Sequence, residues 1–117
     1  MPETDRLISS LADIAAESFR LRRVFMRAVR NADAGEYKKY VSQFSWFEKK
    51  VDKALKEAGL SVVDLSGQRY DPGMAVTPLN LDDFDPDTEL VIDRMMEPVI
   101  MKEDRLIRTG TVILREE

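Results

Sequence analysis

The chain has 117 residues, the length of one ordinary domain or of two very small ones. With 44% hydrophobic and 34% charged residues it has enough apolar material for a core, which excludes disorder throughout. It contains neither histidine nor cysteine, so the usual general base near neutral pH, the thiolate nucleophile and the nitrogen and sulfur ligands of zinc are all missing. We therefore expect a binding protein that is not an enzyme and uses no cofactor.

The first residues and the apolar runs bear on location. The segment 1–6 (MPETDR) is acidic and polar, unlike a secretory signal. The longest purely apolar stretches, such as 24–26 and 99–101, are far shorter than the roughly 20 residues that cross a bilayer. These features predict a cytoplasmic protein that makes no membrane contact.

Charge is divided unevenly along the chain. Residues 1–58 hold 12 Lys and Arg against 9 Asp and Glu, a net +3, whereas residues 59–117 hold 6 against 13, a net −7. The densest basic cluster consists of Arg20, Arg22, Arg23, Arg27 and Arg30. Because acidic residues precede it on the same predicted helix, the cluster indicates a solvated or protein-docking surface, and we expect no nucleic-acid partner.

The segment 4–30 contains no glycine or proline, and its apolar residues recur at alternating spacings of four and three. This spacing predicts a helix with a bundle-type seam, interrupted once by Ser18. A second partial stripe, which includes Phe19 and Met26, makes the apolar face wider than one partner helix can cover.

A second helix is predicted over residues 34–58. Asp33, followed three positions later by Glu36, resembles a capping box, and Gly59 supplies the carboxyl-terminal stop. We expect Trp46 to lie in the core or in a dimer interface. Since a hairpin of this kind cannot bury both broad stripes, we predict an antiparallel helix pair (residues 1–58) that forms a four-helix bundle in a homodimer. The predicted dimerisation residues are Leu7, Leu11, Ile14, Leu21, Phe25, Tyr40, Phe44, Phe47 and Val51.

Residues 59–117 predict a small all-β domain, which makes the whole chain an α+β protein. Short β-rich runs are expected at 60–65, 74–76, 88–92, 98–101 and 111–115, with turns at 71–73 and 108–110. Strands this short favour a small sandwich or barrel.

An acidic run occupies residues 82–89. Asp83, Asp85 and Asp87 match the first, third and fifth positions of a calcium-binding EF-hand loop, but Thr88 and Arg94 stand where glycine and a bidentate glutamate are required. We therefore predict a solvated loop and no metal site. A carboxylate enzyme is the alternative for this run, and it predicts a pocket around the acids.

Three pieces of the chain, taken in order, resemble the GrpE family, the nucleotide-exchange factors of DnaK-type chaperones. They are the Gly59-Leu60 junction after the paired helices, the segment 67–76 (GQRYDPGMAV) and the closing segment 104–114 (DRLIRTGTVIL). The long paired helices that precede the bundle in the family are not part of this sequence, so roles that depend on them are not expected here.

The resemblance implies a co-chaperone that binds a DnaK-type ATPase domain and opens its cleft to release ADP. It implies partner contacts at Gly59, Tyr70, Asp71, Pro72, Met74, Val76, Arg105 and Arg108. For Arg108→Ala we expect weaker partner binding with a nearly unchanged melting temperature. The alternative is a dimeric helical adapter that keeps the fold without exchange activity.

Overall fold

A computed structural model describes residues 2–117 as two compact units, with the boundary between Gly59 and Leu60. The first unit contains the helices α1 (Glu3–Ala28) and α2 (Ala34–Glu57). The second contains six strands and one short 3-10 helix. The predicted α+β class, a helix pair followed by a small β domain, is confirmed.

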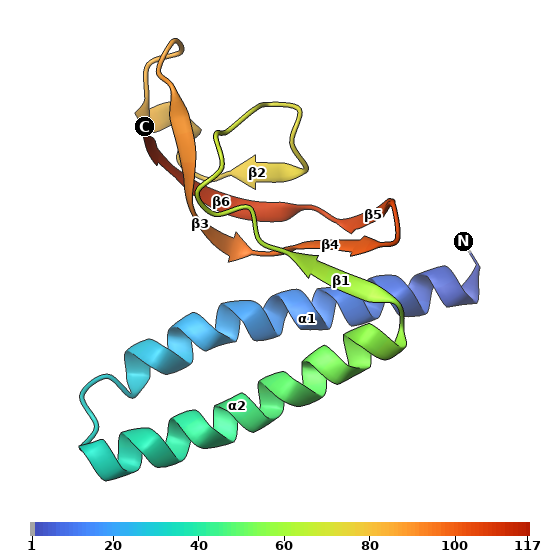
Figure 1. The fold of residues 1–117 in the computed structure, drawn as a ribbon, viewed down its shortest axis with the longest axis vertical. Coiled ribbons are helices and arrows are strands. Elements are labelled where there is room, and N and C mark those ends of the chain that lie inside the picture. Colours follow the sequence, from blue (N-terminus) through green and yellow to red (C-terminus); the bar gives the residue numbers. More distant parts are fainter. Residues whose placement is uncertain (1) are drawn as a thin grey trace. The chain divides into compact units, whose positions relative to one another are not determined.

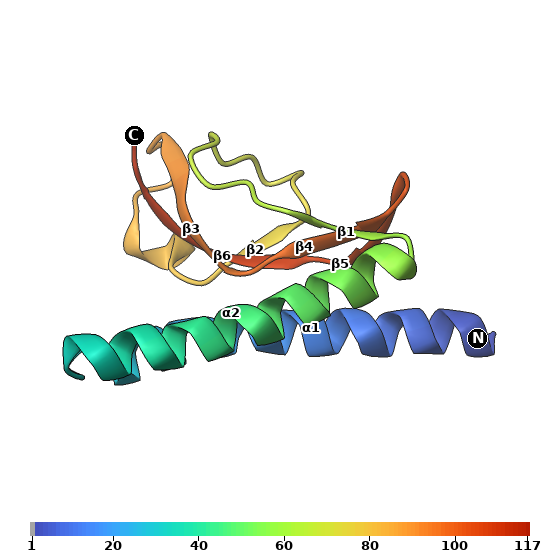
Figure 2. The same ribbon diagram turned by 60° about the horizontal axis from the view of Figure 1, so that its bottom comes forward.

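The helices lie side by side and run in opposite directions, as two views of the ribbon show (Figures 1 and 2). Helix α1 begins after Pro2 and has Glu3 and Asp5 in its first turn, where carboxylates favour the helix dipole. Helix α2 begins at the predicted cap, because the Asp33 carboxylate accepts a hydrogen bond of 2.9 Å from the backbone N–H of Glu36. No helix within residues 2–117 combines the length and the apolar character that crossing a bilayer requires.

Aromatic packing joins the two helices. The rings of Phe25 and Phe44 are stacked with centroids 4.7 Å apart, and Phe47 lies against Phe44 at 5.7 Å. Ser18, the polar break in the apolar seam, donates its hydroxyl to the carbonyl of Ala15 at 2.7 Å. The hydroxyl therefore has a hydrogen-bond partner in the helix backbone, which explains how a serine fits in the apolar seam.

Replacing Asp33 by alanine should lower the stability of the helix pair by about 1 kcal/mol, because the Glu36 N–H loses its only side-chain acceptor. Asp52→Ala, an exposed position inside the same helix, is the matched control and should change stability by less than about 0.5 kcal/mol. Circular dichroism at 222 nm during urea unfolding measures both. Equal losses would show that the cap contributes nothing of its own.

The second unit holds two three-stranded sheets. In the first, β1 (Leu60–Val63), β4 (Val99–Lys102) and β5 (Arg105–Arg108) lie in that order and are antiparallel. In the second, β6 (Gly110–Glu116) lies between β2 (Val76–Pro78), to which it is parallel, and β3 (Leu90–Glu97), to which it is antiparallel. The 3-10 helix η1 (Leu81–Asp83) follows β2.

Apolar residues from both sheets form the core of this unit: Leu60, Leu90, Val91, Ile92, Met95, Val99, Ile100, Val112 and Leu114. Asn80 fixes the chain beside β6, since its amide accepts from the N–H of Leu114 at 2.8 Å and donates to the carbonyl of the same residue at 2.9 Å. Gly110, the first residue of β6, is buried where no side chain fits.

The structure departs from the expected strands at β2, β3 and β5. Strand β2 covers 76–78 and shares only Val76 with the predicted run 74–76, and the turn predicted at 108–110 is absent because only Thr109 separates β5 from β6. Strand β5 was not predicted, because the turn before it has no glycine or asparagine; Glu103 instead adopts a positive φ of 55°. Strand β3 continues to Glu97, five residues beyond the predicted end, with irregular pairing at two points. Where a small sandwich or barrel was predicted, the structure has two three-stranded sheets, one of them mixed.

Candidate functional site

One face of the helix pair is apolar and open. Leu7 and Ile14, one heptad apart on α1, are 64% and 62% exposed, and Leu21 continues the same line. On α2, Tyr40 and Phe47 are also exposed. In water, large apolar side chains at heptad spacing mark a contact surface rather than a solvated one.

A groove of about 280 Å³ lies in this face, lined almost wholly by apolar surface. Its lining residues are Leu21, Phe25, Tyr40, Gln43, Phe44 and Phe47. Five of these six are among the predicted dimerisation residues, which come from both helices. We name this surface, from Leu7 to Leu21 on α1 and from Tyr40 to Phe47 on α2, the open face.

The predicted dimerisation residues do not all lie on the surface. Phe44 is only 9% exposed, so it supports the floor of the groove and offers little area to a second copy. Leu11, Phe25 and Val51 are half-buried. Trp46 is not in the core: it is 64% exposed and does not line the groove.

The predicted partner residues of the second unit begin in a tight turn. The Asp71 carboxylate accepts from the N–H of Gly73 at 2.9 Å, and the carbonyl of Asp71 accepts from the N–H of Met74 at the same distance. Such a local acceptor fixes the turn without help from distant residues. Asp71 and Pro72 are exposed, and Met74 and Val76 are half-buried.

Tyr70 and Pro72 also line a hollow of about 650 Å³. Its other walls come from the segment 81–90, which includes the acidic run together with Leu81, Phe84 and Pro86. The predicted solvated loop is therefore one wall of a concave surface. A hollow here is also what the carboxylate-enzyme alternative predicts, and this alternative stays a prediction. Within residues 2–117, no group of three or more acidic side chains has an arrangement that could hold a metal ion.

Arg69 belongs to this hollow, although sequence reasoning did not single it out. Its guanidinium lies 3.0 Å from the carboxylate of Glu117 and 3.2 Å from that of Glu89. The hydrogen bond and charge of Glu117, with the charge of Glu89, raise the pKa of Arg69 above its ordinary value. The arginine joins the end of the chain to the edge of the acidic run. The only sequence signal was its position directly before Tyr70.

The remaining predicted residues are at three other places. Gly59 follows the end of α2 with φ 76°, a conformation that favours glycine after a helix. Arg105 and Arg108 are at the two ends of β5, and Arg105 is exposed. Val76 pairs with Gly110, which lies two residues after Arg108.

Arg108 takes part in a half-buried ion pair. Its guanidinium donates to the Glu97 carboxylate at 2.9 Å, and the Thr111 hydroxyl donates to the other oxygen of the same carboxylate at 3.2 Å. Both charged side chains are less than a third exposed, 27% for the arginine and 22% for the glutamate. The expectation that Arg108→Ala leaves stability nearly unchanged therefore no longer holds.

Arg108→Ala should instead lower the free energy of unfolding by about 1–2 kcal/mol, because the Glu97 carboxylate stays half-buried but no longer has the guanidinium that compensates its charge. Arg94→Ala, at an exposed position of β3, is the control and should cost less than about 0.5 kcal/mol. Thermal unfolding followed by circular dichroism separates the two. An Arg108→Ala protein as stable as the Arg94→Ala protein would contradict the structural role of the ion pair.

No family model matches the chain, and neither a curated protein nor a solved structure shows significant similarity to it.

Proposed function

We propose that the protein is a GrpE-like nucleotide-exchange factor, a cytoplasmic co-chaperone that acts as a homodimer on a DnaK-type ATPase domain. The observation that carries the proposal is the order of the family-like segments and the places they occupy in the fold. Gly59 ends α2, Asp71 and Pro72 form a structured surface turn, and the segment 104–114 runs through β5 into β6.

The dimer part of the proposal is supported by the open face. A groove with apolar walls and exposed heptad residues on both helices is what one half of a four-helix bundle presents before its partner is added. Leu7, Ile14 and Leu21 are exposed in the single chain, and burying each of these side chains in a dimer would favour association by about 1.5–3 kcal/mol.

The partner part of the proposal is supported by residues of the β unit, of which Pro72 and Arg105 are exposed and Tyr70 is half-buried. Tyr70 and Pro72 give an aromatic and a rigid contact beside the acidic hollow, and Arg105 gives a cation on β5. A few such anchors can supply most of the free energy of a standard interface.

Exchange needs no covalent chemistry. A protein that binds the open form of an ATPase cleft more tightly than the closed form lowers the affinity for nucleotide by the same factor. Moving a cleft from mostly closed to mostly open takes about 5 kcal/mol of differential binding. A rigid β unit whose core is continuous across β3 and β6 can hold contact residues in the fixed geometry that such discrimination requires.

Release of fluorescently labelled ADP from the DnaK-type ATPases of the same cell tests the proposal. Excess protein should speed release from at least one of them by tenfold or more, about 1.4 kcal/mol. Tyr70→Ala combined with Pro72→Ala should reduce the acceleration, while Leu79→Ala, an exposed apolar position after β2, serves as control. Acceleration of none of these ATPases would overturn the exchange function, and binding without acceleration would favour the adapter.

A further inference from the structure

We propose that α2 carries a second docking surface, next to the open face on the same helix, that binds an acidic region of a protein partner through Trp46 and the surrounding lysines. We name this surface the lysine face. Six of the seven lysines of the chain lie in α2, and all six are exposed: Lys38, Lys39, Lys49, Lys50, Lys53 and Lys56.

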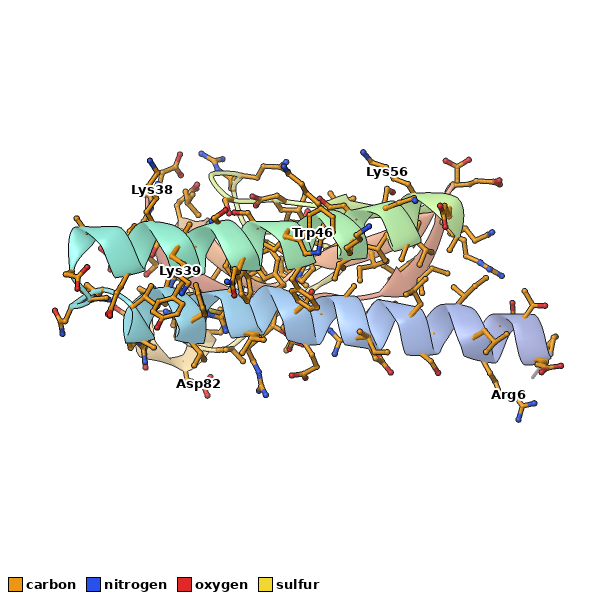
Figure 3. The ribbon with its side chains drawn as sticks, turned by 90° about the horizontal axis from the view of Figure 1, so that it is seen from below. Arg6, Lys38, Lys39, Trp46, Lys56 and Asp82 are labelled. Atoms are coloured by element: carbon orange, nitrogen blue, oxygen red, sulfur yellow. The ribbon has the colours of Figure 1, made fainter. Side chains whose placement is uncertain are left out.

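Helix periodicity gathers these lysines on one side. At 100° per residue, Lys49, Lys50 and Lys53 all fall within about 60° of Trp46 around α2, whereas Phe44 falls on the opposite side. Figure 3 shows Lys38 and Lys56 projecting from the same edge of α2, with Trp46 between them along the helix. From Lys38 to Lys56 the surface is about 27 Å long, which suits an interface of standard size.

Trp46 distinguishes this surface from an ordinary solvated helix face. It is the one tryptophan of the chain, it is 64% exposed, and the ammonium of Lys50 lies 4.5 Å from the centre of its ring. An exposed aromatic ring within a charged rim has the anatomy of an interface anchor. The ammonium packs on one face of the ring, and most of the side chain stays exposed.

The lysine face is positively charged, so an acidic partner would complement it. Of its six lysines, only Lys53 has an ion pair within residues 2–117, and this contact with Glu57 is long (3.9 Å) and highly exposed. The lysine face thus has an excess of positive charge that carboxylates of a partner would complement.

Several observations favour a protein over a nucleic acid or an anionic bilayer. The face contains lysine and no arginine, although arginine suits phosphate groups better because of its bidentate geometry. It has one exposed aromatic ring, where binding of single strands relies on several. The net charge of −4, with −7 on residues 59–117, also repels a long polyanion more than a local acidic patch.

Trp46 makes the test direct, because all indole fluorescence comes from this face. The full chain is titrated with poly-L-glutamate at ionic strengths of about 0.01 M and about 0.15 M. We expect a saturable change in Trp46 emission whose midpoint moves to higher concentration at the higher salt. Lys49→Glu combined with Lys53→Glu should weaken binding by at least about tenfold.

Arg6→Glu combined with Arg94→Glu changes the net charge equally at exposed positions outside the lysine face and should leave binding within about twofold. No emission change with poly-L-glutamate would overturn the proposal, as would equal weakening in the two double variants. Tighter binding of an oligo(dT) strand or of phosphatidylserine vesicles would also overturn it and would assign the face to that ligand. None of these outcomes depends on nucleotide exchange.

Discussion

Leu21→Glu combined with Phe47→Glu is expected to turn the proposed homodimer into a folded monomer. The two side chains lie on different helices, both line the groove of the open face, and both are exposed in the single chain. The double variant loses two apolar contacts of about 1.5–3 kcal/mol each and sets carboxylates against an apolar partner surface, so association should weaken by more than about 100-fold. Light scattering after size-exclusion chromatography measures the mass, and circular dichroism checks that the helices persist.

The matched control is Leu79→Glu combined with Leu106→Glu. These leucines are similarly exposed but belong to the β unit, so the control protein should remain a dimer. If the Leu21 and Phe47 variant also remains a dimer, the open face is not the interface. If both double variants dissociate, the effect comes from added charge rather than from the groove.

Gly110→Ala is expected to destabilise the β unit by about 1–3 kcal/mol. An added Cβ would lie 2.8 Å from the Cε of Met95, 3.0 Å from the carbonyl oxygen of Glu97 and 3.0 Å from a methyl of Val99. The methionine methyl can move aside, but the backbone oxygen is held in β3. The strands must therefore separate or shift to admit one methyl group.

The loss should be followed in urea through the methyl NMR signals of Ile92 and Ile100, which lie in the core of the β unit. Gly35→Ala is the control, because its Cβ would meet only Asp33 Oδ1 at an ordinary 3.5 Å, and alanine favours a helix. We expect this control to be as stable as the parent or slightly more stable. A Gly110→Ala protein of unchanged stability would show that β3 and β6 are not packed as the structure has them.

The sequence predicted the helix pair well because the signals are local. The heptad spacing in 4–30, the cap at Asp33 and the stop at Gly59 each act within a few residues, and the observed helices end within two residues of the expected carboxyl-terminal bounds. The turn at Asp71 was predictable for the same reason, since its hydrogen bonds are made to neighbours in sequence.

Non-local pairing set the limit of prediction in the β unit. The parallel contact of β2 with β6 joins residues more than 30 positions apart, and no local pattern indicates it. Strand β5 was missed because the turn before it, Glu103-Asp104, lacks the glycine or asparagine that usually adopts a positive φ. The partnership of Arg108 with Glu97 depends on the same long-range pairing, so its contribution to stability was not expected.

The candidate site was only partly predictable. Heptad spacing identified most residues of the open face, but it could not tell which of them the helix pair buries by itself, as it does Phe44. Trp46 was expected in the core or in a dimer interface; its 64% exposure excludes the core of the single chain, and the dimer interface stays a prediction. The hollow beside Tyr70 is formed by two segments about ten residues apart in the sequence, so only the structure reveals it.

Sedimentation equilibrium on the unmodified chain tests most directly whether the open face is incomplete in a single copy. One chain has a mass of 13.4 kDa, so the account predicts a species of twice that mass, 26.8 kDa, at micromolar concentration. A homogeneous 13.4 kDa species under these conditions, with Leu7, Ile14 and Leu21 left in water, would contradict it.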